Sequence, residues 1–185
     1  MSLTKEQSSA LKRNLAAVQR VIFNIRAHDK IFEADTVHPG IDFIQLAYRA
    51  LFNDAALQSM NVFEGKNGGK ARSFWWLYKQ KQKEVDEFVK CKKLNWSLLE
   101  EVSEKLKDIR NGTHAHFSHQ YADDYKRVWE AAGLKGDDWL KALDIVWEVL
   151  AYLQGDDHLP SLDYDGEDAK EATKFISALC TGKNL

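Results

Sequence analysis

The chain has 185 residues, of which 44% are hydrophobic, enough for the core of one domain and too many for a disordered chain. Two prolines, ten glycines and two cysteines exclude a collagen-like chain, a many-turned all-β chain, a disulfide framework and a four-cysteine zinc site. Residues 1–110 carry 19 basic and 14 acidic side chains, whereas residues 111–185 carry 7 and 14, and the formal net charge is −2. No apolar run approaches the ~20 residues of a membrane span, and residues 1–13 lack the apolar core of a secretory signal. We therefore expect a cytoplasmic protein with no membrane partner.

The first part of the chain is expected to form two helices and a loop. Thr4 and Gln7 predict a capping box at the start of a first helix. Pro39 predicts the first turn of a second helix, which should end near Phe63. The glycine-rich sequence EGKNGGK at residues 64–70 predicts a loop.

The same helical spacing of apolar residues continues to the end of the chain, and no stretch alternates like a strand. Further helices are expected over residues 73–93, 97–110, 123–132, 137–155 and 167–179. Ser97 with Glu100 predicts a second capping box, and Asp137 predicts a further N-cap. We therefore predict one all-α domain over residues 1–185, an up-and-down helical bundle with additional short helices.

Three of the six histidines lie in residues 110–119, which have the sequence RNGTHAHFSH. The Asn-Gly pair after Arg110 is a helix breaker, so the preceding helix is expected to kink or end there. At about 100° per residue, an unbroken helix would place Arg110 on one face with His114 and about 120° from His116. A bend at Gly112 would bring Arg110 and His116 towards one cleft.

Two other interpretations of these histidines remain open. In one, they are ordinary surface or capping residues near a helix end. In the other, they bind a metal, although H-x-H-x-x-H is not the spacing of a standard zinc site. On a helix only His116, His119 and Asp123 would share a face. The His28-Asp29 pair is typical of metal phosphohydrolases, but no histidine precedes it as that family requires.

The residues after the helix that ends at Arg110 resemble a known motif. An arginine, a polar residue and a histidine four to six residues beyond the arginine are the signature of HEPN domains, and Arg110, Asn111 and His116 match it. Ala115 before the histidine is similar to the abortive-infection AbiU-like branch, whose motif is roughly R-D/N-x-x-x-A-H. The sequence YRALFNDAALQSMNVF at residues 48–63 also resembles the second helix of that branch.

This resemblance implies an HEPN-like bundle that acts as a metal-independent endoribonuclease without a cofactor, in phage defence or a toxin-like stress response. It implies a homodimer whose two motifs face each other, with Arg110, Asn111 and His116 as catalytic residues on an RNA substrate. His114 and His119 are auxiliary candidates, and an antitoxin or another regulatory protein is a candidate partner. The alternative is a non-catalytic HEPN-like module that dimerises or binds a ligand or RNA.

A basic and aromatic segment is the candidate RNA-binding surface. Residues 66–93 carry nine basic and three acidic side chains, with Phe74, Trp75, Trp76 and Tyr78 among them. Basic charge beside aromatic faces suits single-stranded RNA. In the competing interpretation, the lysines form a solvated helix face and the aromatic rings belong to the core. The residues predicted to bind RNA are Lys66, Lys70, Arg72, Lys79, Lys81 and Lys83.

Overall fold

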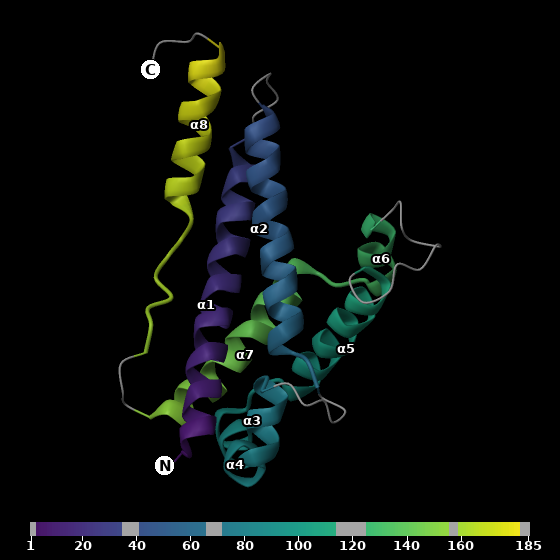
Figure 1. Ribbon diagram of the computed structural model, residues 1–185, viewed down its shortest axis with the longest axis vertical. Coiled ribbons are helices and arrows are strands. Elements are labelled where there is room, and N and C mark those ends of the chain that lie inside the picture. The colour runs from purple at the N-terminus through teal and green to yellow at the C-terminus, as the bar shows by residue number, and fades with distance from the viewer. Residues whose placement is uncertain (1–2, 35–40, 66–71, 114–124, 156–158, 182–185) are drawn as a thin grey trace. The chain divides into compact units, whose positions relative to one another are not determined.

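The computed structural model describes residues 3–34, 41–65, 72–113, 125–155 and 159–181. These residues form eight helices and no strand, which confirms the predicted all-α fold (Figure 1). The helices are α1 (Lys5–Glu33), α2 (Ile41–Val62), α3 (Phe74–Gln80), α4 (Gln82–Lys92), α5 (Trp96–Thr113), α6 (Tyr125–Ala132), α7 (Gly136–Gln154) and α8 (Glu167–Thr181). Within the described ranges, each helix is too short or too polar to span a membrane.

Two compact units divide the chain. The first unit contains residues 1–18 and 59–160, and the second contains residues 19–58 and 161–185. Helices α1 and α2 therefore each contribute one part to either unit. The candidate catalytic motif belongs to the first unit, together with the basic and aromatic segment.

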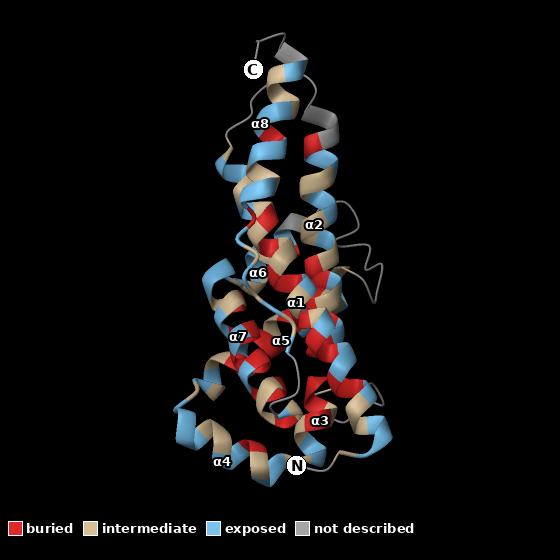
Figure 2. Cartoon of the chain, turned by 90° about the vertical axis from the view of Figure 1, so that its left-hand side faces the viewer, coloured by how far each residue is buried: buried red, intermediate tan, exposed pale blue. Residues whose placement is uncertain are grey.

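The core of the first unit is centred on α7. This helix packs against α5 and α4, and it completely buries Leu143, Val146 and Leu150. On α5, Leu99 and Leu106 are buried at helical spacing, and Figure 2 shows buried residues along both helices. Full burial of an aliphatic side chain stabilises a fold by about 1.5–3 kcal/mol, so these rows account for much of the unit's stability.

The first helix starts as predicted, and α5 does not. Thr4 N donates to Gln7 Oε1 at 2.9 Å and Gln7 N donates to Thr4 Oγ1 at 3.2 Å, so the first capping box is confirmed. The capping box predicted at Ser97 is wrong, because Asn95 Oδ1 accepts the backbone N–H of Leu98 at 3.2 Å. The Ser97 hydroxyl instead donates to Asn95 Oδ1 at 2.8 Å, which supports the asparagine as the cap.

Two other predicted helices differ in detail from the observed ones. The segment expected as one helix over residues 73–93 forms α3 and α4, with Lys81 between them at φ −131° and ψ 29°. Helix α4 ends at Lys92, and its C-cap Lys93, with a left-handed φ of 56°, closes the last turn. Helix α7 begins at Gly136 after an extended Lys135, so Asp137 lies in its first turn and is not the N-cap. Its carboxylate still favours that helix end through the helix dipole.

In the second unit, α1 and α2 are joined by a shared carboxylate and by ring stacking. Asp54 of α2 accepts a hydrogen bond from Arg20 Nε and another from Asn24 Nδ2, both at 2.6 Å. Further along the same pair of helices, the rings of His28 and Tyr48 stack with centroids 3.8 Å apart. These contacts fix the two helix segments against each other along their length.

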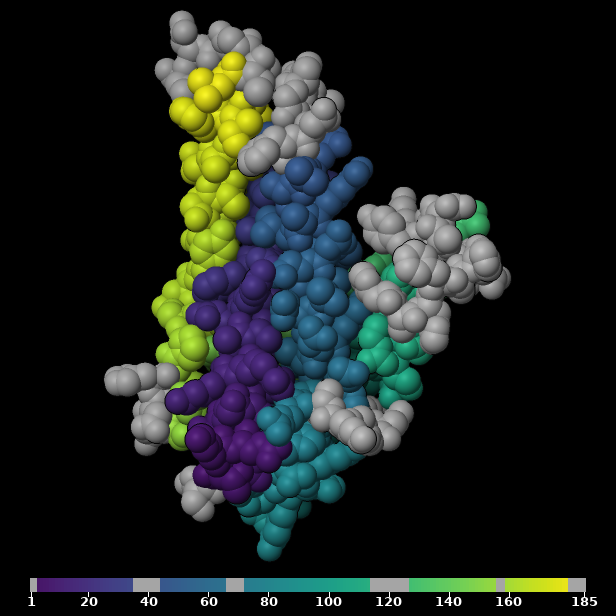
Figure 3. All heavy atoms as spheres, in the orientation of Figure 1, coloured from purple at the N-terminus to yellow at the C-terminus, as the bar shows by residue number. Residues whose placement is uncertain are grey.

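The segment before α8, residues 161–166, is called the strap here and runs along α1 (Figures 1 and 3). Arg26 Nη1 donates to two carbonyl oxygens of the strap, at 2.5 and 2.8 Å, and Gln19 Nε2 donates to a third at 2.7 Å. The ring of Tyr164 packs on Phe23, with centroids 4.9 Å apart. Side chains of α1 therefore satisfy the carbonyl groups of a segment that has no secondary structure.

Beyond the strap, ion pairs hold α8 to α1. Lys30 Nζ lies 2.7 Å from Glu167 Oε1, and Lys170 Nζ lies 3.1 Å from Glu33 Oε2. Hydrogen bonds from Lys30 and Lys170 lower the pKa of the Glu33 carboxyl. All four side chains are partly exposed, so this network orients α8 more than it stabilises the fold.

We expect Gly166→Ala to destabilise the protein more than Gly155→Ala. Both glycines have positive φ, 83° and 80°, so alanine strains the backbone at either position. At Gly166 a Cβ would also lie 2.8 Å from the Arg26 carbonyl oxygen, whereas at Gly155 no atom of the described residues lies within 4 Å. The expected losses are about 1–3 kcal/mol at Gly155 and about 1–3 kcal/mol more at Gly166. Chemical denaturation measures both, and equal losses would contradict the close approach of the strap to α1.

Candidate functional site

Arg110 and Asn111 lie in the last turns of α5, which continues through Gly112 to Thr113. The helix therefore does not stop before Gly112, and a kink there stays a prediction. Thr113 Oγ1 donates to the Ile109 carbonyl oxygen at 2.6 Å, an additional hydrogen bond in the final turn. The motif residues beyond the helix, His114, His116, His119 and the metal candidate Asp123, lie outside the described residues.

Gly112 marks the place where α6 approaches α5. A Cβ at this position would lie 2.8 Å from Val128 Cγ1, and the Val128 side chain is buried. Valine is β-branched and has few rotamers, so its methyl group has little freedom to move aside. The absence of a side chain at Gly112 therefore permits this close packing of α6 on α5.

The guanidinium of Arg110 forms an ion pair with Glu64, at the end of α2. Arg110 Nη1 lies 3.2 Å from Glu64 Oε1, and the two side chains are 33% and 42% exposed. Arg110 Nε is buried and has no hydrogen-bond partner among the described residues. The carboxylate therefore satisfies only one side of the guanidinium. Leaving a buried donor without an acceptor costs about 1–3 kcal/mol.

Helix α3 positions both partners of this ion pair. Ser73, the N-cap of α3, donates from its hydroxyl to the backbone carbonyl of Glu64. Two residues further on, the buried Trp75 Nε1 donates to Ser103 Oγ of α5 at 2.8 Å. Ser103 lies two turns before Arg110 on the same helix. The same short helix is therefore hydrogen bonded to the residue that carries the carboxylate and to the helix that carries the arginine.

Sequence reasoning did not identify Glu64 as a site residue. It is the first residue of the segment predicted as a loop, and it lies far from Arg110 in the chain. The sequence around an acidic residue at the start of a loop contains no spacing or motif that would indicate which basic residue it pairs with. Ser73 was visible as a helix start, but its hydroxyl contact with Glu64 depends on the tertiary structure.

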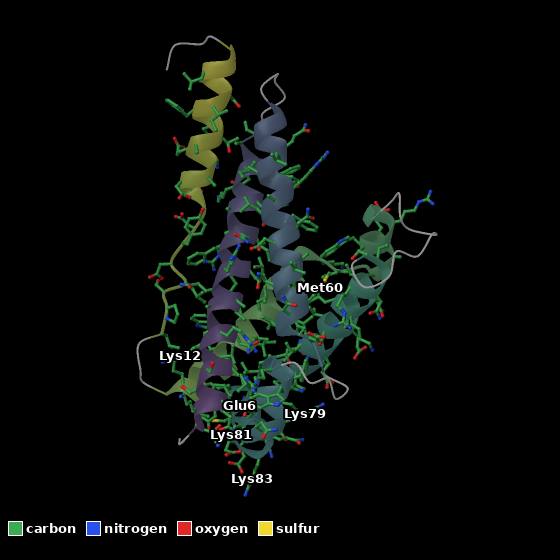
Figure 4. All side chains as sticks on the ribbon, in the orientation of Figure 1. Glu6, Lys12, Met60, Lys79, Lys81 and Lys83 are labelled. Carbon is green, nitrogen blue, oxygen red and sulfur yellow. The ribbon has the colours of Figure 1, made fainter. Side chains whose placement is uncertain are left out.

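Most of the described basic residues in the predicted RNA-binding set already have partners within the chain. The pairs are Arg72 Nε with Glu6 Oε1 at 2.7 Å, Lys79 Nζ with the Gly65 carbonyl at 3.4 Å, and Lys81 Nζ with Glu84 Oε1 at 3.7 Å. Lys83 is exposed, and Figure 4 shows it with Lys79 and Lys81 around the junction of α3 and α4. Lys66 and Lys70 lie outside the described residues.

Two of the four aromatic residues named in this segment, Phe74 and Trp75, pack in the core. Phe74 and Trp75 are 0% and 1% exposed, and the rings of Trp75 and Tyr78 contact Trp96 with centroids 5.6 and 5.0 Å apart. The Tyr78 hydroxyl donates to Asp86 Oδ1 at 2.8 Å, and burial with this hydrogen bond raises its pKa to about 12. The buried rings of Phe74 and Trp75 are not available to stack on bases, whereas Trp76 and Tyr78 remain partly exposed.

The described part of the chain contains no group of three His, Cys, Asp or Glu side chains arranged to hold a metal ion. His28 Nδ1 lies 3.1 Å from Asp29 Oδ1, but the histidine ring stacks on Tyr48, so this pair belongs to the packing of α1 on α2. Comparison with protein-family models, curated proteins and solved structures finds no match to this chain. Its function is therefore inferred from the motif and from the geometry around Arg110.

We expect Gly112→Ala and Val128→Ala to be coupled. Gly112→Ala alone gains helix propensity of up to about 1 kcal/mol but introduces a clash that costs about 1–3 kcal/mol, so it should destabilise. In a Val128→Ala background the clash disappears, and the same substitution should become neutral or stabilising. Denaturation of the four proteins of this cycle gives the coupling energy. Gly136→Ala is the matched control, because Gly136 is a helical glycine whose Cβ position has no described atom within 4 Å. Additive effects of Gly112→Ala and Val128→Ala would contradict the contact.

Proposed function

We propose that this chain is a metal-independent endoribonuclease of the HEPN type, with Arg110, Asn111 and His116 as its catalytic residues. The observation that carries the proposal is the placement of Arg110 at the end of α5, partly exposed and held by Glu64, directly before the histidine-rich segment. The all-α fold is compatible with this class, and the match of the motif to HEPN domains supplies the reaction type.

The proposed reaction needs a base, an acid and positive charge. An imidazole takes the proton of the ribose 2′-hydroxyl, and the 2′-oxygen attacks the adjacent phosphorus. The bond from phosphorus to the 5′-oxygen then breaks, and an imidazolium returns a proton to that oxygen. Arg110 stabilises the charge on the phosphorane through two-point contact with its oxygens. Asn111, which is exposed on α5, would hold the arginine or the histidine by hydrogen bonding.

One chain supplies one Arg110 and one His116, which is few groups for three roles. In a homodimer whose motifs face each other, two histidines would serve as base and acid and two arginines would contact the phosphate. A role in phage defence or a toxin-like stress response, with an antitoxin or another regulatory protein as partner, belongs to the same proposal.

A second candidate is a non-catalytic helical module that binds RNA or another ligand. It is favoured by the neutralisation of Arg110 by Glu64 and by the internal partners of Arg72 and Lys79. In such a module the histidines would carry no chemistry.

We expect His116→Ala to lower the rate of RNA cleavage by about 10²–10⁴-fold, because it removes the group that transfers protons. Arg110→Lys should also be severely impaired, since lysine keeps the charge but loses the planar two-point contact with phosphate. His114→Ala and His119→Ala should have smaller effects, because the motif R-D/N-x-x-x-A-H selects the histidine that follows Ala115, and neither of these two does. Cleavage of a mixed-sequence RNA measures all four variants.

Circular dichroism of each variant controls for folding. Cleavage should persist in a metal chelator, and the products should end in a 2′,3′-cyclic phosphate or its hydrolysis product. Activity that disappears in chelator and returns with a divalent cation would instead support metal binding by His116, His119 and Asp123. If His114→Ala is inactive and His116→Ala is active, the catalytic histidine has been assigned wrongly. A wild-type chain that cuts no RNA would support the binding module.

We also expect a homodimer in solution. A two-fold symmetric interface places identical residues of the two chains near the axis, which is how two His116 side chains would reach one phosphate. Light scattering at micromolar concentration measures the mass directly. A strictly monomeric protein that still cleaves RNA would contradict the composite site.

A further inference from the structure

The contact between Arg110 and Glu64 is one-sided. The guanidinium has five N–H groups, and the carboxylate contacts it through Nη1, while Nε is buried without an acceptor among the described residues. A guanidinium that binds a carboxylate well uses two parallel hydrogen bonds. The observed arrangement therefore holds the arginine by its charge and leaves part of its hydrogen-bonding capacity unused.

We propose that Glu64 is a positioning residue that holds the Arg110 guanidinium in a resting position, and that a phosphate group of the ligand displaces this carboxylate. The identification of that ligand as RNA rests on the proposed function. The resting position itself rests on the ion pair and on an Nε that no described residue accepts a hydrogen bond from.

The two partners differ in how firmly they are held. The Glu64 backbone is fixed by the Ser73 hydroxyl, and the adjacent Gly65 carbonyl accepts a hydrogen bond from Lys79 Nζ at 3.4 Å. Arg110 has a long side chain in the last turns of α5, and one third of it is exposed. When the carboxylate is displaced, the arginine is the partner with freedom to move. Rotation of its guanidinium would expose Nε together with an Nη group, which is the two-point geometry that phosphate oxygens accept.

Competition between a carboxylate and a phosphate for one arginine makes a clear electrostatic prediction. Glu64→Gln removes the negative charge but keeps the size of the side chain, so affinity for phosphate at Arg110 should rise. Ion pairs with this degree of exposure correspond to at most about a fivefold change in affinity. Glu64→Asp keeps the charge and should bind phosphate like the wild-type chain.

The matched control is Glu101→Gln. Glu101 lies on α5, in the same unit, and pairs with Lys105 at 2.7 Å rather than with Arg110. Both substitutions change the net charge equally, so a general electrostatic effect would raise affinity in both variants. A specific release of Arg110 would raise it only in Glu64→Gln.

The experiment is a titration of the full chain with inorganic phosphate, followed by the ¹⁵N-detected Nε–H resonance of Arg110, which is assigned by its absence in Arg110→Lys. We expect this resonance to shift with phosphate, at lower concentrations in Glu64→Gln than in the wild-type, Glu64→Asp and Glu101→Gln chains. Equal titrations in all four chains would overturn the proposal. If Glu64→Gln does not fold, the wild-type titration decides, because a resonance unchanged at saturating phosphate would also overturn it.

A second titration uses a labelled 2′-O-methyl RNA of about 12 nucleotides, a length typical of single-strand sites. It has no free 2′-hydroxyl, so binding is measured without cleavage. Tighter binding in Glu64→Gln alone would support the displacement of Glu64 by a phosphate diester, and unchanged binding would overturn RNA as the displacing ligand. Failure of the proposed function is a separate result: a gain of affinity in Glu64→Gln beside a wild-type chain that cuts no RNA keeps the positioning role and removes the nuclease.

Discussion

A single buried hydrogen bond determines how the parts of the candidate site meet. The indole of Trp75 is almost completely buried, so its N–H needs an acceptor within the core, and Ser103 of α5 provides one at 2.8 Å. This bond sets the position of the short helix α3 along α5. Because Ser73 begins α3 and also donates to the Glu64 carbonyl, the same bond determines where the carboxylate lies relative to Arg110.

A second indole in the first unit is satisfied in the same way. Trp139 of α7 donates from Nε1 to Ser59 Oγ of α2 at 3.0 Å, and both residues are buried. In each case a small hydroxyl residue leaves room for the large ring and rotates its oxygen to accept the proton. The unit therefore uses serines in its core to orient helices, whereas the second unit uses charged side chains of α1 on the carbonyl groups of the strap.

The surroundings of Arg110 combine stability with unused binding capacity. Most buried polar groups in folded proteins are satisfied, and exceptions are concentrated at functional sites. Among the described residues, the Nε of Arg110 is such an exception, and it lies beside a carboxylate whose backbone is held by a hydrogen bond. A carboxylate in this position keeps the arginine ordered when no anion is bound. The carboxylate also competes with phosphate for Arg110, so it lowers the affinity for the ligand as well as orienting the arginine.

The sequence alone determined the helical fold and the start of the first helix, because apolar periodicity and the Thr4–Gln7 cap depend on neighbouring residues. Its motif also singled out Arg110 as a candidate site residue. Only the tertiary structure decided the role of Gly112, since a glycine ends a helix or permits close packing according to what lies against it, here Val128. The partner of Arg110 was likewise decided by the fold. Glu64 and Arg110 are distant in the chain, and a contact between distant residues arises from the packing of α2, α3 and α5, which no local spacing encodes.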